Sequence, residues 1–145
     1  MGEETARTVR LSVPSQPPRK SNSRRIVSLK NKGGGSAPRL IKSKEALHYE
    51  EVFRLSTLRQ RDSMLGSKTK LLRVEGDVYY RKRFVADLSI ELVLDCMTKC
   101  GIIADDRYVV EIDIRKRWAD DDGGIELTVT ELDAKEYKWE PQPNN

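Results

Sequence analysis

The segment YVVEIDIRKRW, residues 108–118, and the segment IELTVTEL, residues 125–132, decide the fold class. Apolar and polar residues alternate in both, which is typical of strands with one buried face. The segment ADDDGG, residues 119–124, separates them, and its acids and glycines favour a tight turn. The sequence therefore predicts two strands that pair as a β-hairpin.

Further strands and helices are expected on the N-terminal side of this hairpin. The sequence predicts a strand over 9–14, a helix from the N-cap Ser43 to about Met64, a strand over 70–81 and a helix from Asp87 to about Cys100. The order of these elements predicts an α+β fold with a small mixed sheet and two helices. We expect one domain over residues 9–132, flanked by a flexible N-terminus at 1–8 and a flexible tail at 133–145.

Length and composition exclude several classes of protein. The chain has 145 residues, which suits one domain, and 34% of them are charged. No apolar run approaches the roughly 20 residues of a membrane-spanning helix, and no apolar block follows the N-terminus as in a secretory signal. Two cysteines are too few for a disulfide scaffold. We therefore expect a soluble cytoplasmic protein with no membrane partner.

Positive charge is concentrated near the N-terminus. Residues 7–44 contain eleven Lys or Arg and no Asp or Glu, a pattern that attracts polyanions. The glycine-rich segment 33–38 separates two short apolar and basic segments, so a basic flap over 19–44 is expected. The alternative is a solvated, disordered arm. The residues expected to contact phosphates are Arg24, Arg25, Lys30, Lys32, Arg39 and Lys42 in the flap, and Lys99 at the end of the second helix.

Acidic residues gather around that second helix. Asp87, Glu91 and Asp95 are each four residues apart, a spacing that places them on one helical face. The pair Asp105 and Asp106 follows after a short connector. Carboxylate oxygens are the ligands that Mg²⁺ prefers, and a Mg²⁺ ion beside a phosphate-binding flap could activate water for attack on a phosphodiester. The alternative is an exposed acidic helix face followed by an ordinary turn.

Other residues offer less chemistry. His48 is the only histidine, which argues against a histidine metal site or a Ser-His pair, and Cys96 and Cys100 are expected to pack in the helix. No P-loop or dinucleotide motif is present, so no nucleotide cofactor is expected. Lys99 either contacts phosphate or offsets the helix dipole. Trp118 could stack on an unpaired base or belong to the core.

The segment DCMTKCGIIADDRYVVE, residues 95–111, resembles the signature region of the RusA family of crossover-junction endodeoxyribonucleases. In that family an Asp-rich helix start, a helix that ends in Lys-x-Gly and an Asp-Asp-x-x-Val-Val segment recur in this order. Residues 115–132 resemble the closing hairpin of the family. The proline-bearing and basic N-terminal segment resembles its opening, so the resemblance spans residues 9–132.

The resemblance implies a RusA-like, dimeric fold and a specific activity. A homodimer would resolve Holliday junctions and related branched DNA by paired symmetric nicks, with Mg²⁺ or alternatively Mn²⁺, in a bacterial or phage-infected cell. The partners implied are four-way junction DNA and a second copy of the chain. Asp87, Asp105 and Asp106 match the catalytic and metal-binding acids of the family.

The chain departs from the family pattern at one acid. The second acid of the Asp-x-Asp motif falls on Ser89 if Asp87 is the first, and otherwise the first falls on Val85. Glu91, one turn after Asp87, is expected to restore the lost ligand. One alternative is a catalytically weakened protein that binds branched DNA. A second is an RNA-binding or protein-interaction domain, although no RNA-recognition motif with paired aromatics is visible.

Overall fold

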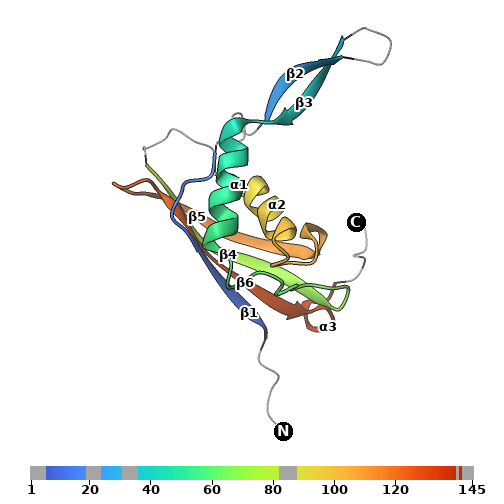
Figure 1. Cartoon of the computed structure of the whole chain (residues 1–145). Helices are drawn as coiled ribbons and strands as arrows, with labels where there is room; N and C mark the ends of the chain where they lie inside the picture. Colours follow the sequence, from blue (N-terminus) through green and yellow to red (C-terminus); the bar gives the residue numbers. More distant parts are fainter. Residues whose placement is uncertain (1–5, 19–23, 31–35, 82–87, 140, 142–145) are drawn as a thin grey trace, which may run out of the picture.

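The computed structural model describes residues 6–18, 24–30, 36–81, 88–139 and 141, with only the backbone described in 24–30 and 36–40. These residues form a small α+β protein with a four-stranded sheet, a separate two-stranded hairpin and three α-helices (Figure 1). The expected α+β class is confirmed. No helix in this described part is long and apolar enough to cross a membrane.

The four-stranded sheet has a mixed topology. Its order is β1 (Thr8–Val13), β6 (Gly124–Asp133), β4 (Lys70–Tyr80) and β5 (Val109–Trp118). β6 is antiparallel to both β1 and β4, whereas β5 is parallel to β4. All four strands lie close to their predicted positions.

The predicted pairing of the last two strands is wrong, because β4 lies between β5 and β6. The connection after β5 instead crosses the end of β4, where the Ala119 N–H donates to the Tyr80 carbonyl oxygen at 3.0 Å. β4 and β5 are parallel because the helix α2 (Glu91–Lys99) returns the chain between them. Strand alternation specifies which face is buried but not which strand is the neighbour.

α1 (Lys44–Ser56) begins as predicted and ends early. The Ser43 Oγ accepts a hydrogen bond from the Ala46 N–H at 3.1 Å, which makes Ser43 the N-cap. The helix ends at Ser56 rather than near Met64. Thr57 Oγ1 donates to the Phe53 carbonyl oxygen at 2.8 Å, and Met64 itself has a φ of 51°, which a helix cannot contain.

α2 is shorter than predicted at its start. It begins at Glu91, and residues 88–90 are not helical. The expected row of Asp87, Glu91 and Asp95 on one helical face is therefore wrong, because the helix carries only the last two. Asp87 itself lies outside the described residues. Gly101 follows the helix with a φ of 70°, the left-handed conformation expected for its cap.

The core lies between the sheet and the two long helices. Both helices pack on one face of the sheet (Figure 1). The sheet contributes fully or nearly fully buried Leu11, Val13, Leu72, Val74, Val78, Ile125, Leu127 and Val129, and the helices contribute Tyr49, Phe53, Val93, Cys96 and Met97. Burial of this apolar surface is the main favourable contribution to folding and fixes α2 relative to β5.

Two segments lie outside this core. The hairpin of β2 (Arg24–Lys30) and β3 (Ser36–Lys42) projects beyond the start of α1, so the two short segments of the expected flap pair as antiparallel strands, while their loop lies outside the described residues (Figure 1). The expected loose tail instead begins with a helical turn, α3 (Ala134–Tyr137), capped by the Asp133 carboxylate.

Candidate functional site

Asp105 and Asp106 lie in the short connection between α2 and β5. The Asp105 carboxylate caps a 3₁₀ turn, Asp106–Tyr108, by accepting a hydrogen bond from the Arg107 N–H at 2.9 Å. The Arg107 guanidinium also approaches Asp105 at 3.4 Å, but its side chain is mostly exposed. The 3₁₀ turn therefore fixes the backbone so that the two adjacent acids stay together at the start of β5.

The pKa values of these two acids are shifted in opposite directions. The pKa of Asp106 is raised by partial desolvation and then by the neighbouring carboxylates of Asp105 and Asp95. The pKa of Asp105 is lowered, chiefly by the N–H of Arg107. We call Asp95, Asp105 and Asp106 the carboxylate cluster. Because these like charges repel one another, a cation near Asp105 and Asp106 would relieve the repulsion.

The cluster differs from the predicted ligand set. Glu91 lies one turn before Asp95 in α2 and is exposed, and its N–H donates to the Ser89 Oγ at 3.5 Å. Asp95 was not predicted as a ligand. The sequence feature that could have indicated it is its spacing of four residues from Glu91 on the same helix. Among the described side chains, no three His, Cys, Asp or Glu lie close enough to hold a metal ion together. The structure thus brings Asp105 and Asp106 together without placing Glu91 beside them.

The predicted phosphate-binding residues lie mainly on the hairpin. Its backbone register pairs Arg24 with Lys42 and Val27 with Arg39, so basic residues stand on both strands. Arg25 and Lys30 lie on β2, while Lys32 falls outside the described residues. The hairpin is therefore a separate element of the fold. Its basic residues precede α1 in the sequence, whereas the acids follow α2.

Two of the predicted phosphate contacts, Lys42 and Lys99, meet at one carboxylate. The Nζ atoms of both lysines are ion-paired with the Oε1 atom of Glu50 in α1, and that of Lys99 lies 3.0 Å from it. Glu50 was not predicted as a functional residue, and no local pattern marks it, because its partners are eight and 49 residues away. Lys99 thus has a specific partner beyond the helix dipole.

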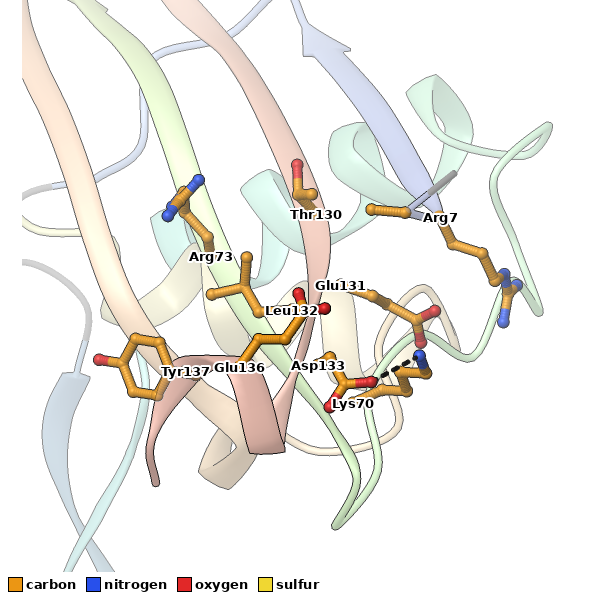
Figure 2. A pocket seen from close by; sticks show the side chains of 10 residues that line it. Arg7, Lys70, Arg73, Thr130, Glu131, Leu132, Asp133, Glu136 and Tyr137 are labelled. Atoms are coloured by element: carbon orange, nitrogen blue, oxygen red, sulfur yellow. Dashed lines mark ion pairs between the residues drawn. The ribbon is translucent and has the colours of Figure 1, made fainter. Parts of the chain in front are cut away.

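A separate pocket of about 1060 Å³ lies where β1, β4, β6 and α3 meet (Figure 2). Its cations are engaged: Arg73 pairs with Glu111 at 2.5 Å, Lys70 pairs with Asp133 at 3.7 Å, and Arg7 donates to a backbone carbonyl oxygen at 2.7 Å. Two of the three cations in the described lining are therefore ion-paired and the third, Arg7, is held by a backbone carbonyl, so the candidate site remains the carboxylate cluster and the basic hairpin.

The fold and these two features define a class of molecule: a small α+β protein with adjacent acids after α2 and a projecting basic hairpin. No protein-family model matches the chain. A search of curated proteins finds no match either.

Proposed function

We propose that this protein is a Mg²⁺-dependent, structure-selective endodeoxyribonuclease of the RusA type, which resolves four-way DNA junctions as a homodimer. The observation that carries the proposal is the adjacent pair Asp105 and Asp106, held together by the 3₁₀ turn, in which partial desolvation and then the charges of Asp105 and Asp95 raise the pKa of Asp106. Perturbed acids of this kind are frequent in sites that bind cations or transfer protons. The motif around these acids supports the same activity.

The donor chemistry of the acids suits a hard divalent cation. Asp105 and Asp106, with Asp87 as the further predicted ligand, would supply carboxylate oxygens, which Mg²⁺ prefers and Mn²⁺ accepts. A bound Mg²⁺ would lower the pKa of a coordinated water and offset the charge that develops on the phosphate. The 3₁₀ turn would keep Asp105 and Asp106 oriented, with Asp105 held by the Arg107 N–H at 2.9 Å.

The basic hairpin would bind the DNA. Lysine and arginine contacts to backbone phosphates displace condensed counterions and position the duplex without reading its sequence. A projecting hairpin suits a branched substrate, because it can reach along one arm while the sheet and helices face the crossover. The residues proposed for these contacts are Arg24, Arg25, Lys30, Lys32, Arg39, Lys42 and Lys99.

A homodimer would account for two nicks in one junction. A closed twofold dimer presents two equivalent sites, which suits a four-way junction with its own twofold symmetry. α1 exposes Leu55, and Leu58 follows just after the helix, each more than half exposed. These leucines are the surface that we propose a second copy covers.

A second candidate is a catalytically weakened protein that binds branched DNA. It is favoured by the missing acid of the Asp-x-Asp motif, which falls on Ser89 or Val85, and by the lack of a three-ligand metal group among the described side chains. This protein would retain the basic hairpin and its affinity for junctions. It would lack the metal affinity that hydrolysis needs.

A nicking assay separates the two candidates. A labelled synthetic four-way junction and a linear duplex of the same sequence are incubated with the full chain, in Mg²⁺, in Mn²⁺ and with chelator. Symmetric nicks in the junction that require the metal support the nuclease. Tight junction binding without cutting in either metal supports the binding protein, and preference for RNA in competition would contradict both.

A further inference from the structure

One carboxylate joins the base of the basic hairpin to the helix pair. Lys42 is the last residue of β3, and Lys99 is the last residue of α2. Both pair with the same oxygen of Glu50, which lies near the middle of α1. Two cations expected to bind phosphate are therefore already engaged by one carboxylate within the protein, and the trio keeps a net charge of +1.

The burial of this trio is unequal. The Glu50 side chain is 18% exposed, whereas the side chains of Lys42 and Lys99 are 27% and 57% exposed. Burial alone would raise the pKa of Glu50, but its hydrogen bonds from both lysines outweigh this effect and lower it. Glu50 is thus an ionised and largely buried acid, whereas the two lysines that pair with it remain accessible to solvent or to a ligand.

More cations surround this acid. A groove of about 350 Å³ between α1 and α2 is lined by Glu50, Lys99, Arg54 and Arg61, with Cys96 and Cys100 also in its wall. Arg54 pairs with Glu51 at 2.5 Å at the exposed rim. No described residue forms an ion pair with Arg61. The described lining of the groove therefore holds three cations and two acids, and Glu50 is the more buried of the two acids.

We infer that Glu50 is an internal counterion that competes with DNA phosphates for Lys42 and Lys99 and so reduces how often these lysines contact DNA in the wild-type complex. The inference rests on the proposed DNA binding, which it extends to the groove between α1 and α2. Each lysine freed from Glu50 gains a phosphate, and each such contact makes the dependence of affinity on salt steeper. Glu50 therefore weakens binding and limits how strongly the protein holds DNA of any sequence.

The variant Glu50→Gln tests this role, with Glu45→Gln as the matched control. Glu45 lies in the first turn of the same helix, is exposed, and has no ion-pair partner among the described residues, so its change removes the same charge without freeing a lysine. Binding of a labelled four-way junction is measured by fluorescence anisotropy, without divalent metal, over a series of salt concentrations.

Glu50→Gln should bind more tightly and with a steeper salt dependence. The slope of log K against log salt should become more negative by about 0.9 for each phosphate gained, or about 1.8 for both lysines. Between about 50 and about 200 mM salt this corresponds to an additional loss in affinity of about tenfold. The added steepness should disappear when Lys42→Met and Lys99→Met are combined with Glu50→Gln.

The opposite results would overturn the inference. A slope for Glu50→Gln equal to that of Glu45→Gln shows that no lysine is released, and weaker binding with a lower melting temperature shows that Glu50 only clamps the hairpin. If the wild-type chain binds no junction, the proposed function fails, and elution from heparin, a sulfated polyanion, decides the counterion role. Elution of Glu50→Gln at higher salt than Glu45→Gln supports that role, and equal elution contradicts it.

Discussion

Lys99 at the end of α2 donates a 3.0 Å hydrogen bond to Glu50 in α1, and so joins two helices whose contact positions the candidate site. Lys42 donates to the same oxygen. The pairing matters for the acids as well as for the hairpin, because α2 carries Asp95 and leads directly into Asp105. A shift in the position at which α2 packs on the sheet would therefore move the carboxylate cluster relative to the hairpin.

The paired Glu50 should make stability depend on pH. Its pKa in the folded protein is lowered, so it contributes stability that is present above the ordinary pKa of 4.5 and is lost as pH falls through the folded value. We expect the free energy of unfolding in urea, measured from about pH 6 to about pH 3, to fall more steeply for wild type than for Glu50→Gln. Parallel curves for the two proteins would show that the ion pairs do not contribute.

Removal of Asp106 should weaken metal binding and spare DNA binding. Asp106→Asn removes one ligand and relieves the charge crowding at Asp105, so affinity for Mn²⁺ in calorimetry should fall by at least about tenfold. Asp113→Asn, an exposed change on β5, serves as the control. Junction affinity without metal should be unchanged in both variants, and its loss in Asp106→Asn would argue for a structural role instead.

Gly76 is required by the pairing of β4 with β6. It has a φ of 144°, and an added Cβ would lie 2.0 Å from the Glu126 carbonyl oxygen. Gly76→Ala should therefore lower the free energy of unfolding by at least about 1–3 kcal/mol. Thr128→Ala, on the neighbouring strand and only half-buried, should cost much less by the same denaturation measurement. Equal costs would contradict the close approach of the two strands.

The sheet order predicts a pattern of hydrogen exchange. β4 is hydrogen-bonded on both sides, whereas β5 pairs only with β4 among the described strands. Backbone amides of β4, like those of the other inner strand β6, should exchange the slowest, at the rate of global unfolding, and alternate amides of β5 should exchange faster. If all backbone amides of β5 are protected from exchange in dilute solution, a further strand or chain covers the side of β5 that faces away from β4. That result would contradict the sheet order for the isolated chain.

The local signals in the sequence predicted the elements better than their arrangement. Ser43 and Gly101 marked helix boundaries because capping depends on a few adjacent residues. The end of α1 was misplaced because apolar spacing continues past Thr57, whose hydroxyl bonds to the preceding turn. The pairing of β5 with β6 was wrong because the position of β4 between them depends on the α2 crossover and on core packing.

The candidate site was likewise predictable only in its local features. Asp105 and Asp106 are adjacent in sequence, so their proximity was predictable. The electrostatic effect of Asp95 on Asp106 depends on how the chain turns after α2, and the meeting of Lys42 with Lys99 at Glu50 depends on three separate elements. No spacing rule reports such long-range electrostatic contacts.

The most direct test of the central claim is the cleavage of one labelled four-way junction by wild type and Asp106→Asn, side by side with binding. The proposed nuclease predicts paired nicks at symmetric positions for wild type in Mg²⁺, none with chelator, and none for Asp106→Asn at equal junction occupancy. Full occupancy of the junction by wild type with no nicks in Mg²⁺ or Mn²⁺ would contradict it.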